Sequence, residues 1–213
     1  MVNSNIPKGV MSADYFHDRT TKKHLIYRFK SRAFEAVRSF QKYSTSSSKP
    51  NILDFGSADG FALTETHKLL DANLSFGVEY SEDLINSAGE RPPSCSIIQG
   101  DVTKSLDQVK SGNFDLVTAL AILEHLDEPI ELFHRAHDAL KPRGLMVATC
   151  PSPFRDKISG KFNLHDDDFH AFDFNRQAFS HFSDRIIGAF VIFNWIFVNQ
   201  IFIARKKEHQ SVG

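Results

Sequence analysis

The sequence predicts an α/β fold in which helices flank a doubly wound, mostly parallel sheet of seven strands. Two observations carry this prediction. In residues 52–60 a short apolar run ends at an acid and two glycines follow, which is typical of a buried strand that enters a tight turn. Apolar segments of strand length then alternate with helical segments along the chain, which indicates parallel strands joined by helices. At 213 residues the chain is long enough for one large domain of this kind and too short for two.

An arm and a cover helix are expected over residues 1–49. Residues 1–13 show no periodicity, whereas residues 20–43 carry apolar side chains at spacings of three and four. We assign to the apolar face Leu25, Ile26, Phe29, Ala33, Phe34, Val37 and Phe40, and to the opposite face Lys22, Lys23, Arg28, Lys30, Arg32, Arg38 and Lys42. Such a helix either covers the sheet with a solvated basic face, which we favour, or binds an acidic partner or a membrane surface.

The remaining elements are expected within one domain over residues 50–213. Helices are expected at residues 61–70, 81–88 (with Ser81 as N-cap), 128–140 and 175–183. After the first strand, further strands are expected at residues 74–78, 95–98, 114–118 and 145–149, with two more within 189–203. Between the helix at 128–140 and the strand at 145–149, Pro142 and Gly144 stop the helix. Residues 151–174 form a long loop, of the kind that serves as a lid or substrate-binding segment.

Charge and composition narrow the class of protein. The net charge of −1 provides no broad basic field, so a nucleic-acid partner is disfavoured. Cys95 and Cys150 lie in or beside apolar runs and are expected to pack as small hydrophobic side chains. The N-terminus has no apolar signal segment, so we expect a cytoplasmic protein. Polar residues interrupt the apolar stretch 188–204, which favours two packed strands over a transmembrane segment.

Three acids follow successive strands, at the sheet edge where α/β proteins bind ligands. Asp54 ends the first strand and could support the turn or face a cationic ligand group. Glu79 comes about twenty residues after the glycine turn, where an acid can bind both hydroxyls of a ribose. Asp101 could accept a hydrogen bond from an exocyclic amine such as that of adenine. Each acid alone fits a helix N-cap or a solvated loop, but the three together, with Gly56 in the turn, indicate a nucleotide-type site.

Five segments together resemble a class I S-adenosylmethionine-dependent methyltransferase of the small-molecule branch often called type 11 or 12. They are residues 52–60, Gly77-Val78-Glu79-Tyr80, Gln99-Gly100-Asp101-Val102, residues 114–129 and residues 140–151. The resemblance covers about residues 50–151 and implies a Rossmann-like fold with S-adenosylmethionine as cofactor. It assigns cofactor binding to Asp54, Gly56, Ala58, Gly60, Glu79, Tyr80, Asp101, Val102, Ala119 and Leu120. The family often has a third glycine where this chain has Ala58.

The segment Leu123-Glu124-His125-Leu126 resembles a signature that follows the fourth strand in this branch. His125 is therefore a candidate general base, because the unperturbed pKa of imidazole lies near neutrality. In the alternative, which we favour, Glu124 and His125 orient the loop and cap the next helix. Some relatives bind a metal through a Glu at the position of Ala121, so no metal site is expected here.

The loop over residues 151–174 carries both acids and aromatic side chains. Its segment at residues 165–170 matches no specific metal-ligand motif, so a solvated acidic loop is favoured over a metal site. The phenylalanines around it could enclose an apolar or aromatic acceptor. His165, His170 and Phe172 are the candidate residues of this lid.

The resemblance implies methyl transfer from S-adenosylmethionine to a small-molecule acceptor, with oxygen preferred. A non-catalytic protein that binds the cofactor or a partner on the same fold stays an alternative. An NAD-dependent oxidoreductase is disfavoured, because the turn lacks the G-x-G-x-x-G spacing and no Tyr is followed four residues later by Lys. Nucleic-acid methylation is disfavoured too, since no Asn/Asp-Pro-Pro-aromatic segment follows the fourth strand. The acceptor's identity and the oligomeric state are not predicted.

Overall fold

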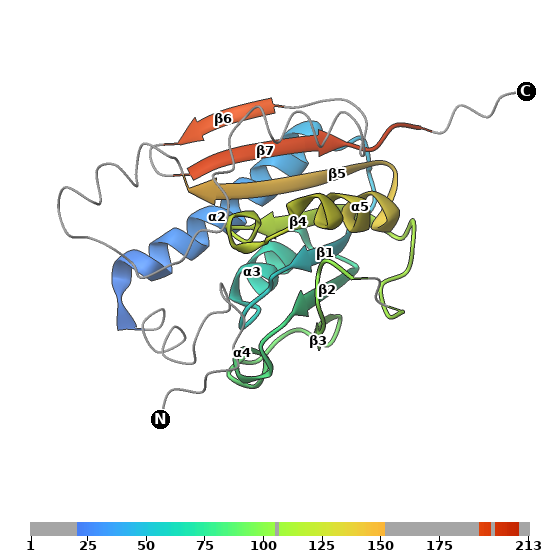
Figure 1. The fold of residues 1–213 in the computed structure, drawn as a ribbon. Coiled ribbons are helices and arrows are strands. Elements are labelled where there is room, and N and C mark those ends of the chain that lie inside the picture. Colours follow the sequence, from blue (N-terminus) through green and yellow to red (C-terminus); the bar gives the residue numbers. More distant parts are fainter. Residues whose placement is uncertain (1–20, 105–106, 152–191, 197–198, 209–213) are drawn as a thin grey trace, which may run out of the picture.

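A computed structural model of the chain describes residues 21–104, 107–151, 192–196 and 199–208 (Figure 1). The strands of its sheet are β1 Asn51–Phe55, β2 Leu74–Glu79, β3 Cys95–Gln99, β4 Phe114–Leu120, β5 Leu140–Pro151, β6 Ile192–Ile196 and β7 Asn199–Arg205. The helices are α2 Lys23–Tyr43, α3 Phe61–Leu70, α4 Glu82–Asn86 and α5 Pro129–Ala139, with a 3₁₀ turn, η1, at Leu123–His125.

The seven strands form one sheet in the order β3-β2-β1-β4-β5-β7-β6. The pairs β1–β2, β2–β3, β1–β4 and β4–β5 are parallel, whereas β5–β7 and β6–β7 are antiparallel. The chain runs outward from β1 to β3 and then returns to β4 on the other side of β1, so the strand order reverses between β1 and β4. The predicted doubly wound, mostly parallel seven-stranded sheet is confirmed.

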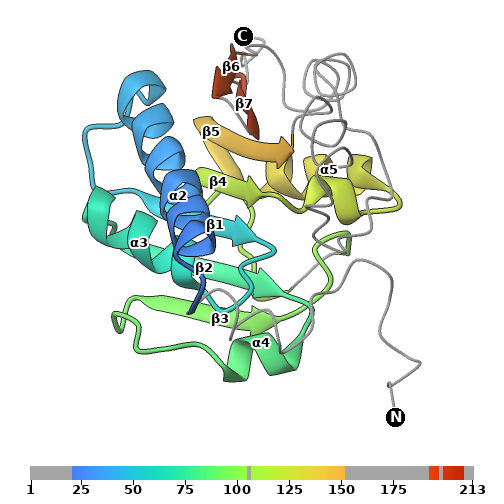
Figure 2. The ribbon, with the colours of Figure 1, turned by 90° about the vertical axis from the view of Figure 1, so that its left-hand side faces the viewer.

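Helices cover both faces of this sheet (Figure 2). On one face, Ala36 and Phe40 of α2 and Leu63 of α3 pack with Ile52 of β1. On the other face, the buried side chains of α5 pack with Leu53, the next residue of β1. Successive side chains of a strand point to opposite faces, so one short apolar strand supplies both halves of the core.

Two residues of α2 lie on the opposite face from the one predicted. Phe34 was expected in the core but is 56% exposed, and Arg32 was expected in solvent but is only 6% exposed. Phe29, Ala36 and Phe40 define the buried stripe. Arg32 follows Phe29 by three positions and precedes Ala36 by four, so it falls on this stripe, whereas Phe34 is rotated well away from Phe29.

The strand β5 begins earlier than predicted. We expected it at residues 145–149, but it starts at Leu140, directly after α5, and its register against β4 shifts between Phe114 and Leu116. Arg143 has a φ of +66°, and the irregularity accommodates the proline and glycine that stop the helix. The end of α5 is tied to the sheet by Lys206, whose Nζ donates to the carbonyls of His137 (2.6 Å) and Leu140 (2.8 Å).

Smaller predictions are confirmed within the described residues. Ser81 is the N-cap of α4, since its Oγ accepts a hydrogen bond from the Leu84 amide. Cys95 and Cys150 are buried free thiols. The last apolar stretch contributes β6 and β7, and no helix in the described part of the chain has the length and apolarity to cross a membrane. The predicted arm at residues 1–13 and the predicted helix at 175–183 lie outside the described residues, as does nearly all of the predicted lid.

Candidate functional site

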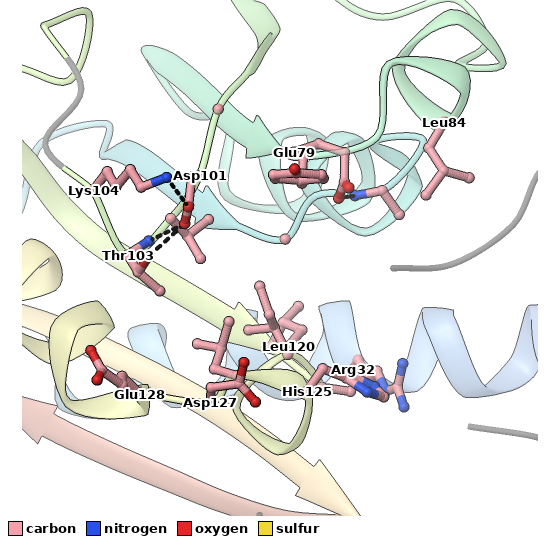
Figure 3. Close-up of a pocket in the computed structure, with 18 of the residues that line it drawn as sticks. Arg32, Glu79, Leu84, Asp101, Thr103, Lys104, Leu120, His125, Asp127 and Glu128 are labelled. Atoms are coloured by element: carbon pink, nitrogen blue, oxygen red, sulfur yellow. Dashed lines mark hydrogen bonds and ion pairs between the residues drawn. The ribbon is translucent and has the colours of Figure 1, made fainter. Parts of the chain in front are cut away.

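A cavity of about 530 Å³ lies at the carboxyl ends of the parallel strands, beside the point where the strand order reverses (Figure 3). Its walls come from the segments that follow β1, β2, β3 and β4, and from α2. The predicted site residues that line it are Gly56, Ala58, Glu79, Tyr80, Asp101, Val102, Leu120 and His125. Ligands of open α/β sheets bind at this position, because the loops on either side of the reversal diverge and leave a crevice.

The turn after β1 is held against β2 by its own backbone. The amides of Gly56 and Ser57 both donate to the Val78 carbonyl, at 2.9 and 3.1 Å. Gly56 has a φ of +74°, and a Cβ there would lie 2.5 Å from Cδ1 of Ile122. Only glycine fits this position, and the bare backbone therefore forms part of the cavity wall.

Ala58 also has a left-handed backbone, with a φ of +48°. This conformation costs an alanine about 1–2 kcal/mol relative to the right-handed one, a cost that a glycine would not have. The Ala58 amide donates to Oε2 of Glu79 at 2.8 Å, and this bond holds the strained residue in place. Gly60, the N-cap of α3, packs against β3 instead: a Cβ there would lie 2.4 Å from Cδ1 of Ile97.

Glu79 joins the loops after β1 and β2. Its side chain is buried at the end of β2, with Oε2 bonded to the Ala58 amide and Oε1 to the Ser81 amide, the latter at 2.9 Å. Each carboxylate oxygen can accept a second hydrogen bond. Glu79 therefore fixes the shape of the cavity wall and keeps acceptor capacity for a ligand with two neighbouring hydroxyls.

Asp101 is held by the residues that follow it. Its Oδ1 accepts hydrogen bonds from the amide and the hydroxyl of Thr103, at 3.0 and 2.6 Å, and its Oδ2 lies 3.0 Å from Nζ of Lys104. Burial alone would raise the pKa of this carboxyl, but the bonds from Thr103 and Lys104 outweigh it and hold the pKa below its usual range. Asp101 is therefore a fixed anion at the cavity wall.

Asp54 is buried beneath the turn and does not line the cavity. Its Oδ1 accepts a hydrogen bond of 2.6 Å from the Thr118 hydroxyl of β4, while its backbone carbonyl accepts one from the Ser57 hydroxyl. Burial and, to a smaller extent, the charge of Glu79 raise the pKa of Asp54 to about 7, against the opposing effect of the Thr118 and Ser57 hydroxyls. Of the two roles predicted for this acid, the geometry matches support of the turn.

The end of β4 separates core residues from cavity residues. Leu120 lines the cavity, whereas Ala119 is fully buried in the core on the α5 side. In η1 the half-buried His125 lines the cavity, and its neighbour Glu124 is buried. Glu124 lies near Cys150, whose pKa is raised by burial and also by the charge of Glu124. The two residues of the signature therefore occupy different environments, one in the cavity wall and one in the interior.

Two residues of α2 line the cavity without having been predicted to do so. Arg32 and Phe29 form this wall, with the Arg32 guanidinium 5.3 Å from the centre of the Phe29 ring. Figure 3 shows Arg32 and His125 on the side of the cavity that faces Glu79 and Asp101. The signal was present in the sequence, since a cation that falls on the apolar stripe of an amphipathic helix is a functional candidate.

The predicted lid residues cannot be placed relative to this cavity. His165, His170 and Phe172 lie outside the described residues. Within the described ranges, no cluster of three or more His, Cys, Asp or Glu side chains could hold a metal ion.

Comparisons with known proteins support one family. Residues 53–148 match the family model of the methyltransferase domain. The chain is 28% identical over 106 residues to the malonyl-[acyl-carrier protein] O-methyltransferase of Halalkalibacterium halodurans, and 27% over 113 residues to the mitochondrial ubiquinone biosynthesis O-methyltransferase of Saccharomyces cerevisiae. These matches cover 48% and 51% of the chain but only 39% and 35% of the two relatives, so the chain spans well under half of their length.

A solved structure shows the same fold. The crystal structure of a SAM-dependent methyltransferase from Archaeoglobus fulgidus superposes with a TM-score of 0.68, at 15% identity, over 92% of this chain and all of that one. At this identity the likeness concerns the fold. The chain is therefore similar to methyltransferase domains in sequence over residues 53–148, and its fold is similar to that of a SAM-dependent methyltransferase.

Proposed function

We propose that the cavity binds S-adenosylmethionine and that the protein transfers its methyl group to a small-molecule acceptor, at oxygen. The observation that carries this proposal is the meeting of the glycine turn, Glu79 and Asp101 around one cavity of a methyltransferase domain. The choice of oxygen is supported by the two curated relatives, which are both named O-methyltransferases.

The chemistry of the cavity wall matches the parts of this cofactor. Glu79 is the acceptor for the two ribose hydroxyls, and Asp101 is the acceptor for the amine of adenine. Of the charged groups of the methionine moiety, the carboxylate needs a cation in the cavity wall. Arg32 is the buried cation of the cavity wall among the described residues, so we assign the carboxylate to it.

The transfer itself demands little of the protein. The bound cofactor supplies a methyl group that is already activated by its sulfonium. The protein then has to hold the acceptor in line, exclude water and remove the proton of the attacking hydroxyl. His125 is the titratable side chain that we propose for the last task, because it lines the cavity on the side opposite Asp101.

Parallel calorimetric titrations with S-adenosylmethionine, S-adenosylhomocysteine and NAD test the proposal. We expect micromolar binding of the first two and none of NAD, followed by methyl transfer in a screen of hydroxylated acceptors. Binding of NAD alone would support the alternative that the protein is an NAD-dependent oxidoreductase. Binding of none would support a non-catalytic protein on this fold.

Replacing Arg32 by Met should weaken binding of S-adenosylhomocysteine by about tenfold or more, because the charge-assisted bonds to its carboxylate are lost. Methylthioadenosine has no carboxylate, so its affinity should change less than twofold. Titration of both ligands checks this, with Lys30→Met, on the exposed side of α2, as the matched control. An equal loss of affinity for the two ligands would show that Arg32 supports the structure of the cavity wall and does not bind the carboxylate.

Replacing His125 by Ala should lower turnover of a hydroxylated acceptor found in that screen by about 10²–10⁴-fold if His125 is the general base. Affinity for S-adenosylhomocysteine should stay within about twofold of the wild type, because the imidazole is not assigned to the cofactor. Turnover at several pH values and calorimetry give the two readouts. If turnover and affinity fell together, the structural role of the signature would be the correct one.

A further inference from the structure

The outward face of α2 carries a stripe of aromatic and basic side chains that no part of the proposed activity uses. We call it the α2 stripe: Lys23, Tyr27, Lys30, Phe34 and Arg38. Tyr27 is 74% exposed and Phe34 56% exposed, and the three cations are exposed too. At 3.6 residues per turn these five positions fall within about 80° of one another around the helix axis. They form a continuous ridge along a helix at the outer surface of the domain (Figure 2).

Charge is distributed unevenly around this ridge. The stripe contains three cations and no carboxylate, and the acid nearest to it in the helix, Glu35, lies on the flank at 3.9 Å from Arg38. The whole chain has a net charge of −1, so the positive potential here is local. The side chain of Glu35 is mostly buried, at 16% exposed, whereas that of Arg38 is 63% exposed. The stripe therefore presents cations and rings to whatever approaches it.

We propose that the α2 stripe binds the surface of an anionic lipid bilayer. Lysine and arginine side chains contact phosphate headgroups, and tyrosine and phenylalanine rings rest at the boundary between headgroups and acyl chains. Aromatic rings that alternate with cations along one exposed ridge match this boundary, where an apolar layer lies directly below an anionic one. Unpaired bases of a nucleic acid could also stack on the two rings, but nucleic acids favour a broader basic surface than one ridge of a helix.

The orientation of α2 makes the two uses of the helix compatible. Phe29 and Arg32 line the cavity from one side of the helix, whereas Tyr27, Lys30 and Phe34 are exposed on the other. A bilayer on the stripe would contact the side of α2 that faces away from the cavity. Binding to lipid is therefore independent of the proposed methyl transfer.

Flotation of the full chain with vesicles tests the proposal. Vesicles of phosphatidylcholine with about 30% phosphatidylglycerol are compared with phosphatidylcholine alone, at low and at high salt. The informative variants are Lys23→Glu with Lys30→Glu, and Tyr27→Ser with Phe34→Ser. The matched control is Lys110→Glu with Lys207→Glu, which makes the same change of charge at exposed positions outside α2.

We expect the wild type to bind the anionic vesicles in a salt-sensitive way, and each stripe variant to lose about tenfold or more of this affinity. The control should bind as the wild type does, and affinity for S-adenosylhomocysteine should be unchanged in all four proteins. Failure of the wild type to bind vesicles would overturn the proposal. An equal loss of affinity in the control would also overturn it. So would binding of the wild type to a heparin column without binding to the vesicles, which would indicate a general site for polyanions.

Discussion

Replacing Glu79 by Gln is expected to lower affinity for both S-adenosylmethionine and S-adenosylhomocysteine by about ten- to a hundredfold. Each oxygen of this carboxylate accepts a backbone amide, from Ala58 and from Ser81. A glutamine has only one acceptor oxygen, so its NH₂ group would face one of these N–H donors. The variant therefore loses a charge-assisted bond of about 1.5–3 kcal/mol and disturbs the wall to which the ribose is assigned.

Calorimetry with both cofactors, and urea unfolding of the same samples, separate the effect on binding from the effect on stability. The control is Glu128→Gln, since Glu128 lines the same cavity but is exposed. It should change affinity by less than twofold. If the Glu79→Gln variant bound both cofactors as tightly as the wild type but was less stable, Glu79 would stabilise the two loops and would not be a ribose ligand.

The strands and the turn were predictable because each is specified by adjacent residues. The stretch from Ile52 to Gly60 contains both its apolar strand and the glycines that its turn requires, so no distant information was needed. Glu79 and Asp101 were predictable for a related reason: in a parallel sheet, residues just after the strands share one edge, whatever the loops do. These parts of the site follow from chain order alone.

Residues whose role depends on packing between elements were harder to place. Arg32 reaches the cavity because the first half of α2 extends to the carboxyl ends of strands that begin 19 or more residues later in the chain. Its position on the apolar stripe marked Arg32 as a candidate, but nothing in the sequence showed which strands α2 would reach. Ala119 and Leu120 are adjacent, yet only Leu120 of the two lines the cavity. Assigning their roles required knowing which face of the sheet each residue occupies.

Replacing Asp54 by Asn is expected to stabilise the protein at alkaline pH. Burial raises the pKa of this carboxyl from 3.8 to about 7, so the folded state binds the proton more tightly than the unfolded state does. Between about pH 4 and pH 7 the folded protein therefore loses stability as the pH rises, and above pH 7 the full cost is present. At 1.36 kcal/mol per pKa unit this cost is on the order of 4 kcal/mol.

An asparagine at this position keeps the hydrogen bond from Thr118, because its amide oxygen can accept it, and removes the buried charge. Urea unfolding at pH 5 and pH 8 should show a stability gain for Asp54→Asn that is larger at pH 8, on the order of 2–4 kcal/mol. Asp127→Asn, at an exposed position of the cavity rim, should show no such dependence. A gain that was equal at the two pH values, or a loss at pH 8, would contradict this account of Asp54.

The same variant tests why the chain keeps Asp54 beneath its turn although the buried charge lowers the stability of the fold. Natural proteins keep destabilising groups mainly where function depends on them. If the carboxylate supports the turn only through its hydrogen bonds, Asp54→Asn should gain stability with unchanged affinity for both cofactors. If its negative charge attracts the sulfonium, affinity for S-adenosylmethionine should fall at pH 8 while affinity for S-adenosylhomocysteine, whose sulfur is neutral, should hold. A neutral residue would then be more stable and less active, so selection on activity would retain the acid.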